Sequence, residues 1–300
     1  MTAPALIHLP SNDTLTGMVR HVTDVVYSTE QGRPLTMNVL APWGLDEDDV
    51  EVPARPLVVY VQGSGWTNPD LGFETPQLAW LARSGYVVAT LTHRSCTEDD
   101  YAPAPAFLQD VKTAIRYLRA HSDDWAIDPE RVAIFGSSSG GNTAELVGVT
   151  GDAPQFRTTE WTEQSDAVSA VVACFGPCDM ERFIDERIAT GEFGYLLTNL
   201  CRTDSKDPEA WREVARAISP IRYVTPLTGP SLPPFLLGLG SEDPWMPEWT
   251  LTAMHERLTE CGALSTGVIV DGAVHEKNFW SQAFLDMVRD FLDEHLHVER

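Results

Sequence analysis

Apolar runs alternate with helical patterns along most of the chain. Buried strands are predicted at Leu57–Val61, Tyr86–Leu91, Arg131–Phe135, Ala170–Ala173, Phe235–Leu237 and Val268–Val270. Helices are predicted at Gln77–Arg83, along the stripe of Phe107, Val111, Ile115 and Leu118, and along the terminal stripe of Phe284, Met287, Val288, Phe291 and Leu292. Strands that are apolar on both faces and alternate with helices indicate a mostly parallel sheet covered by helices on both sides. The predicted fold class is therefore α/β.

Two regions depart from this alternation. Near the N-terminus, Val22–Tyr27 and Leu35–Leu40 predict antiparallel edge strands, followed by an acidic loop at Asp46–Asp49. Residues 179–225 are helical and polar, and they predict an insert that either lies as a lid over the carboxyl ends of the strands or forms a plain peripheral segment. We expect residues 1–300 to form a single domain that includes this insert.

A serine lies at the centre of a G-x-S-x-G pattern, Gly136-Ser137-Ser138-Ser139-Gly140. A strand, Arg131–Phe135, runs into the pattern, and a helix-compatible stretch, Asn142–Val147, runs out of it. Small neighbours permit a turn so tight that the Ser138 side chain is lifted clear of the sheet beside a helix N-terminus. This setting favours a nucleophile, although a plain Gly/Ser turn is the alternative.

A serine hydroxyl needs a base, and the base needs a group that orients it. Asp243 lies on the loop that follows the Phe235–Leu237 strand, and His275 lies on the loop that follows Val268–Val270. Both loops are expected at the sheet edge where Ser138 lies, and the order serine, acid, histidine fits this architecture. The rival acids are Glu242 and Asp271, and the rival bases are His255, His295 and His297.

The attacked carbonyl also needs hydrogen-bond donors for the oxyanion that develops on it. The loop Gln62–Trp66 follows the Leu57–Val61 strand and could present consecutive backbone N–H groups. The amide of Ser139, directly after the nucleophile, is a further candidate. A flexible Gly/Ser loop without such a role is the alternative.

Composition removes several other classes of function. The formal net charge of −23, from 44 acidic and 21 basic residues, disfavours nucleic acid and anionic membranes as partners. Five cysteines form no disulfide framework, and Cys174-x3-Cys178 lacks a second pair at zinc spacing. The sequence shows neither a signal-peptide pattern nor a run of about 18 apolar residues, so a cytoplasmic protein is expected.

These motifs together resemble the α/β-hydrolase superfamily, in its carboxylesterase/lipase branch, and most closely the BD-FAE-like and hormone-sensitive-lipase-like esterases. The likeness covers roughly residues 55–295. It includes the run Ile127–Val132 into the serine turn, the Tyr101–Arg119 helix and the landmark Ser219-Pro220-Ile221. Gln62-Gly63-Ser64-Gly65-Trp66 stands where that branch carries His-Gly-Gly-Gly-Trp, so Gln62 and Ser64 are departures from the pattern.

The resemblance implies Ser138 as nucleophile, His275 as general base and Asp243 as its orienter. It also implies Ser64, Gly65 and Ser139 as oxyanion donors. From their positions near the site loops, Trp66, Trp245 and Trp280 could line an acyl or alcohol pocket, with ordinary packing as the alternative.

The predicted activity is hydrolysis of short-acyl esters of sugars, phenolics or small alcohols through an acyl-enzyme. The expected partner is a small-molecule ester, with no metal and no organic cofactor. A homo-oligomer is compatible with the sequence. The competing hypotheses are an amidase or peptidase of the formamidase-like kind on the same fold, and a non-catalytic binding protein.

Overall fold

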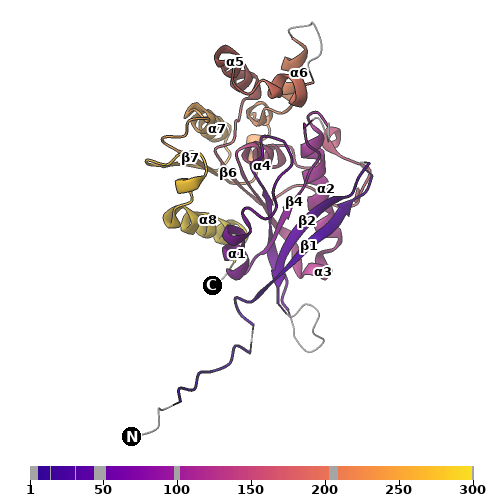
Figure 1. Ribbon diagram of the computed structural model, residues 1–300, viewed down its shortest axis with the longest axis vertical. Coiled ribbons are helices and arrows are strands. Elements are labelled where there is room, and N and C mark those ends of the chain that lie inside the picture. The colour runs from indigo at the N-terminus through magenta and orange to yellow at the C-terminus, as the bar shows by residue number, and fades with distance from the viewer. Residues whose placement is uncertain are drawn as a thin grey trace.

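A computed structural model describes residues 6–13, 15–30, 32–43, 52–97, 102–202 and 209–298. One eight-stranded sheet runs through the molecule in the order β1-β2-β4-β3-β5-β6-β7-β8 (Figure 1). Its strands are β1 (Val19–Ser28), β2 (Leu35–Pro42), β3 (Arg55–Val61), β4 (Val87–Leu91), β5 (Ile127–Ser137), β6 (Ala170–Cys174), β7 (Phe235–Gly240) and β8 (Ser265–Val270). The acidic loop predicted at Asp46–Asp49 lies outside the described residues.

The strand directions confirm the mostly parallel sheet. β1 pairs antiparallel with β2, and β2 pairs antiparallel with β4. All pairings from β4 onward in the sheet order, through β3, β5, β6 and β7 to β8, are parallel. The central strands β3 to β7 are almost wholly buried, as the unbroken apolar runs require. β8, at the sheet edge, shows alternating exposure instead.

Helices cover both faces of the sheet. They are α1 (Thr75–Arg83), α2 (Ala106–Ala120), α3 (Ser122–Trp125), α4 (Ser139–Val149), α5 (Met180–Thr190), α6 (Ala210–Ala217), α7 (Trp249–Glu260) and α8 (Gln282–His295). From β3 the chain moves across the sheet to β4, in the direction of β2. From β4 onward it moves in the opposite direction, through β5, β6 and β7 to β8. Because parallel crossovers are right-handed, α1 lies on one face and α2, α4 and α7 lie on the other. α8 returns beside α1 (Figure 1).

This change of direction fixes where a site can form. After β3 the chain leaves towards β4, and after β5 it leaves towards β6, although β3 and β5 are neighbours in the sheet. The two loops therefore diverge and leave a crevice at the carboxyl ends of β3 and β5, which is where ligands bind in open α/β sheets. The loop at 62–66 and the serine turn at 136–140 both lie at this point.

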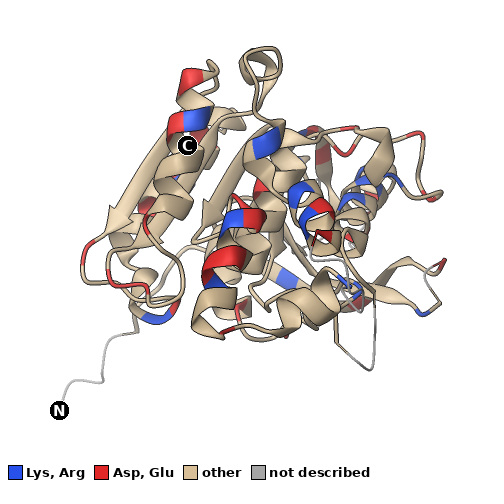
Figure 2. Cartoon of the chain, turned by 90° about the horizontal axis from the view of Figure 1, so that it is seen from above, with Lys and Arg blue, Asp and Glu red and all other residues tan. Residues whose placement is uncertain are grey.

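The predicted insert at 179–225 is helical in its described part. α5 and α6 pack together at the top of Figure 1, and a π-helical turn, η3 (Leu196–Leu200), lies between them in the sequence. Basic and acidic residues are intermingled at this end of the molecule, which Figure 2 views from above. Glu181, for example, pairs with Arg216 at 2.6 Å and with Arg212 at 3.5 Å. None of the helices that the structure describes is both long and apolar enough to cross a bilayer.

Candidate active site

Ser138 occupies a strained turn between β5 and α4. Its backbone has φ 54° and ψ −121°, a region that a residue with a side chain rarely adopts. The turn closes only because its flanking residues are glycines: a methyl group on Gly136 would lie 2.1 Å from the Gly140 carbonyl oxygen, and one on Gly140 would lie 1.9 Å from the Val61 carbonyl oxygen. The half-buried Ser138 side chain is thus held at the apex of a sharp strand-to-helix elbow.

His275 and Asp243 form a hydrogen-bonded pair at the same sheet edge. The Nδ1 atom of His275 lies 2.7 Å from Oδ2 of Asp243, and the ring is 6% exposed. The other oxygen of Asp243 accepts hydrogen bonds from the backbone N–H groups of Trp245 at 2.8 Å and Met246 at 2.9 Å. The carboxylate is therefore fixed by its own loop while it holds the imidazole in one orientation.

The rival acids and bases do not join this pair. Glu242 and Asp271 are exposed, and neither forms a hydrogen bond to His275 among the described residues. His255 faces Ser265 instead, with 2.9 Å between Nδ1 and the hydroxyl oxygen, and His295 lies against Phe291 on α8. Of the candidate pairs, the structure brings together Asp243 and His275.

Trp245 connects the surroundings of Ser138 with the Asp243–His275 pair. Trp245 lines the same pocket as Ser138, and its ring centroid lies 4.8 Å from that of His275. Across the described part of the chain, the Ser138 hydroxyl makes no hydrogen bond to the His275 ring. Such contacts between nucleophile and base are often long or poorly aligned before substrate binds, so the missing hydrogen bond does not argue against Ser138 and His275 as such a pair.

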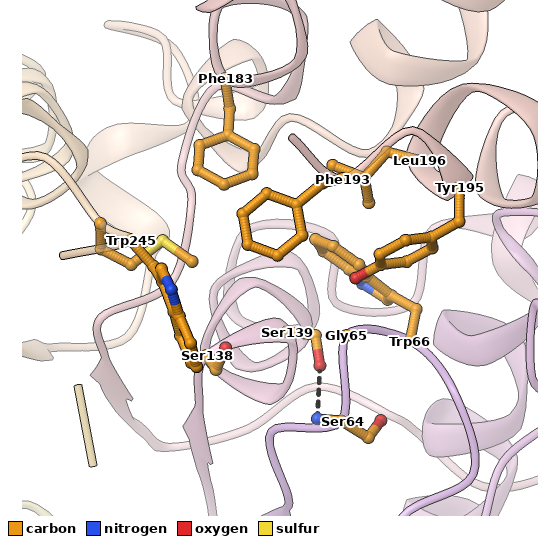
Figure 3. Close-up of a pocket in the computed structure, with 11 residues that line it drawn as sticks. Ser64, Gly65, Trp66, Ser138, Ser139, Phe183, Phe193, Tyr195, Leu196 and Trp245 are labelled. Carbon is orange, nitrogen blue, oxygen red and sulfur yellow. Dashed lines mark hydrogen bonds between the residues drawn. The ribbon is translucent and has the colours of Figure 1, made fainter. Parts of the chain in front are cut away.

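The loop at 62–66 is joined to the serine turn by side-chain hydrogen bonds. The N–H of Ser64 donates to Oγ of Ser139 at 2.9 Å (Figure 3), and the N–H of Gly63 donates to Oγ of Ser137 at 3.2 Å. Ser64 was expected to supply an oxyanion donor, but its N–H is already engaged by the Ser139 hydroxyl. The N–H groups of Gly65 and Ser139 have no hydrogen-bond partner among the described residues.

The departures of this loop from the family pattern are tolerated by its backbone. Positive φ values occur at Gly65 (62°) and Trp66 (59°), and not at Ser64. A serine at position 64 therefore carries no penalty for a left-handed conformation. Its hydroxyl donates to the Thr67 carbonyl at 2.8 Å, which closes the loop on itself.

A buried chain of polar groups supports the loop from below. The Tyr60 hydroxyl donates a hydrogen bond to Glu74 and lies 3.0 Å from Oγ of Ser137, the acceptor for the Gly63 N–H. Burial, with added repulsion from Glu276, raises the pKa of Glu74 to about 7. Burial also raises the pKa of Tyr60 well above its usual value. No sequence pattern marks these polar groups, because Tyr60 lies within a buried apolar strand.

A cavity of about 190 Å³ opens beside Ser138 (Figure 3). Its lining is Ser64, Gly65, Trp66, Ser138, Ser139, Phe183, Phe193, Tyr195, Leu196, Trp245 and Met246. Trp66 and Trp245 thus lie where the sequence placed them. The insert supplies Phe183, Phe193, Tyr195 and Leu196, which sequence reasoning missed because no periodicity or motif marks them.

Trp280 does not line this pocket, and the expectation for it was wrong. Glu276 and Lys277 adopt positive φ values of 57° and 50°, which turn the chain away directly after His275. The Trp280 indole N–H then donates to Glu276 at 2.7 Å, and its ring packs 5.1 Å from the ring of Phe279. Its surroundings are the α1 and α8 side of the sheet.

No group of three or more His, Cys, Asp or Glu side chains is arranged to hold a metal ion within the described ranges. All five cysteines are buried and free. The pocket is bordered by the Ser138 hydroxyl and by backbone N–H groups, and its wall residue Trp245 contacts the His275 ring of the imidazole–carboxylate pair. These are the kinds of group that acyl transfer uses.

The family model named BD-FAE matches residues 47–258, a span that includes the loop at 62–66, the serine turn and Asp243. The chain belongs to the BD-FAE family. His275 lies outside the matched span, so its pairing with Asp243 comes from the coordinates. The sheet, with helices on both faces, is the α/β-hydrolase fold.

Individual relatives of this BD-FAE chain agree with that assignment. Esterase LipC of Mycobacterium tuberculosis is 31% identical over 231 residues, which are 76% of this chain and 54% of the relative. The chain thus spans about half the length of that protein. A solved structure described as a truncated carbohydrate esterase from gut microbiota is 26% identical, with a TM-score of 0.74 over 96% of this chain and 99% of that one.

A butyrate-bound esterase from Thermogutta terrifontis, Est2, supports the fold alone. It is 21% identical, with a TM-score of 0.71 over 94% of this chain and 95% of that one.

Proposed function

We propose that this BD-FAE chain is a serine hydrolase that cleaves carboxylic esters through an acyl-enzyme. The observation that carries the proposal is the pairing of His275 with Asp243 at the sheet edge where Ser138 sits on a strained elbow beside a cavity. The relative named as an esterase and the neighbour named as a carbohydrate esterase support the same reaction class.

The proton path follows from the tautomer of His275. Because Nδ1 faces the Asp243 carboxylate, that nitrogen carries the proton and Nε2 keeps a free lone pair. Nε2 accepts the Ser138 proton as Oγ attacks the ester carbonyl carbon, and it later returns the proton to the departing alcohol oxygen. Water then enters by the same route, with Nε2 as base, and releases the acid.

The negative charge that develops on the carbonyl oxygen needs fixed donors. The N–H groups of Gly65 and Ser139 are the backbone candidates, since both border the pocket and neither is engaged by a described residue. The N–H of Ser64 is excluded because it donates to the Ser139 hydroxyl.

The pocket favours a short acyl group. A cavity of about 190 Å³ is smaller than the 300–1,000 Å³ of drug-sized ligand sites, and its aromatic walls suit a small apolar chain or a ring face. We propose short-acyl esters of carbohydrates, phenolics or small alcohols as substrates, with the insert at 179–225 covering the pocket. The carbohydrate esterase among the structural neighbours supports the carbohydrate option.

The test is pre-steady-state hydrolysis of p-nitrophenyl acetate by the wild type and Ser138→Ala. We expect a burst of p-nitrophenol stoichiometric with the wild-type enzyme, and a loss of turnover on the order of a millionfold in the variant. Ser231→Ala, which removes an exposed serine hydroxyl that does not line the cavity, is the matched control and should keep wild-type rates. Wild-type turnover by Ser138→Ala would overturn the assignment.

Ester and amide substrates share this chemistry, so they need a direct comparison. Assays with p-nitrophenyl acetate and p-nitroacetanilide share one acyl group and differ in the leaving atom. We expect a higher kcat/KM for the ester, and a higher value for the anilide would favour the amidase alternative.

A further inference from the structure

The N–H of Ser64, one of the expected oxyanion donors, is already engaged, and the Tyr195 hydroxyl lies beside the same loop. The N–H of Ser64 is consumed by Oγ of Ser139, and the N–H of Gly63 by Oγ of Ser137. Of the three expected donors, the N–H groups of Gly65 and Ser139 remain for the substrate carbonyl.

The Tyr195 hydroxyl lies directly against this loop. A methyl group on Gly65 would be 2.5 Å from the Tyr195 hydroxyl oxygen, so that oxygen occupies the space over the Gly65 backbone. Figure 3 shows the Tyr195 ring extending from the insert, with its hydroxyl turned towards the cavity. The phenol therefore lines, from the insert, the same pocket as Ser138.

The Tyr195 hydroxyl is also available as a donor. It forms no hydrogen bond to any residue that the structure describes, whereas the hydroxyl of Tyr223, also in the insert, donates to the Ala217 carbonyl at 2.8 Å. Burial raises the pKa of Tyr195 to about 12, so the phenol keeps its proton at any pH where His275 acts as a base. The ring is held edge-on by Phe193, with 6.2 Å between centroids.

We propose that the Tyr195 hydroxyl donates a hydrogen bond to the carbonyl oxygen that Ser138 attacks, together with the N–H groups of Gly65 and Ser139. The phenol keeps its proton throughout; its hydrogen bond strengthens as charge develops on the oxygen and weakens when the carbonyl re-forms. The insert then completes the oxyanion site as well as covering it. This inference rests on the proposed esterase function.

The experiment compares Tyr195→Phe with Tyr223→Phe and wild type, using p-nitrophenyl acetate. Tyr195→Phe keeps the ring and its packing and removes a hydroxyl that has no described partner, so its melting temperature should equal that of wild type. We expect kcat to fall by about 10²–10³-fold with KM changed less than about threefold, as for loss of an oxyanion donor. Tyr223→Phe should keep kcat within about twofold of wild type.

A second readout separates transition-state binding from ground-state binding. The affinity of a trifluoromethyl ketone, which forms a hemiketal oxyanion on Ser138, should fall in Tyr195→Phe by the same factor as kcat/KM. An unchanged kcat/KM, or a raised KM with unchanged kcat and inhibitor affinity, would overturn the role of Tyr195 and leave the esterase assignment standing. A wild-type protein that neither hydrolyses the ester nor reacts with a fluorophosphonate would overturn both.

Discussion

The elbow region, defined as the loop at 62–66 and the turn at 136–140, differs from the insert at 179–225 in how its shape is held. The elbow is fixed by close backbone contacts at Gly136 and Gly140 and by serine hydroxyls that bind backbone N–H groups. The insert is held by ring contacts and by ion pairs that are partly or largely exposed, such as Arg182–Glu186 at 2.9 Å. Exposed pairs contribute at most about 1 kcal/mol each.

The difference assigns separate tasks to the two regions. The elbow has one geometry that tolerates little change, which suits groups that must meet a reacting carbonyl within a fraction of an ångström. The insert presents Phe183 and Phe193 on a less constrained frame, which suits a wall whose shape sets the choice of substrate. Substitutions in the two regions should therefore fail in different ways.

The largest expected effect is on the acid that orients the base. Asp243→Asn would present an amide N–H to Nδ1 of His275 and favour the wrong tautomer, so kcat for p-nitrophenyl acetate should fall by about 10⁴-fold with little change in KM. The matched control is Glu242→Gln, an exposed neighbour on the same loop, which should retain activity within twofold. An equal loss of kcat in the two variants would show that a disturbed loop, and not the lost orientation of His275, lowers the activity.

Paired glycine substitutions compare the rigidity of the two regions. Gly140→Ala would place a methyl group 1.9 Å from the Val61 carbonyl oxygen, so the free energy of unfolding should drop by about 3 kcal/mol, the upper end of the usual overpacking cost. Gly194→Ala in the insert meets nothing within 4 Å and should change it by less than about 0.5 kcal/mol. Urea unfolding measures both, and similar losses would contradict the proposed contrast.

The polar chain beneath the elbow predicts a pH dependence of stability. The pKa of Glu74 is about 7 in the folded protein against an ordinary value of 4.5, so the folded state holds this proton longer than the unfolded state does. The contribution of Glu74 to stability is therefore lost as pH rises from about 4.5 to 7, by up to about 3 kcal/mol, and is constant above that range.

Glu74→Gln should remove this part of the pH dependence. Gln keeps an acceptor for the Tyr60 hydroxyl without a charge to bury. Urea unfolding of the variant and the wild type at pH 5 and pH 8 should show a smaller difference between the two pH values in the variant. If the free energy of unfolding falls equally in both proteins between pH 5 and pH 8, Glu74 is not the source of this pH dependence.

The smallest expected effect is on acyl selectivity at the insert. Phe193→Ala enlarges the cavity beside Ser138 and should raise kcat/KM for p-nitrophenyl hexanoate relative to the acetate by about tenfold. The stability of the fold should change little. Phe73→Ala, at a site that is 63% exposed, is the control, and an equal shift in selectivity there would remove Phe193 from the pocket wall.

The same contrast explains what could be predicted from the sequence. The meeting of Asp243 and His275 could be predicted because each follows a short apolar run, and the carboxyl ends of parallel strands lie at one edge of the sheet. The tight turn at Ser138 could be predicted because sterics require its glycine neighbours, which leaves a recognisable sequence pattern. In the elbow, the residue types that the turn requires locally are the ones that the position in the sheet also requires.

The failures share a different cause. The Ser64 N–H was misjudged because an adjacent hydroxyl, Ser139, competes for it, and such competition depends on a side-chain rotamer. Trp280 was misplaced because Glu276 and Lys277 adopt positive φ against their intrinsic preference. Tyr195 enters the pocket from a segment without periodic pattern, so tertiary packing alone determines its position.

The most direct test of the central claim is the site of covalent modification. Wild-type protein treated with a fluorophosphonate and digested for mass spectrometry should carry one adduct, on Ser138, and His275→Ala should be modified far more slowly. A protein that stays unmodified, or that carries its adduct on a serine other than 138, would contradict the account.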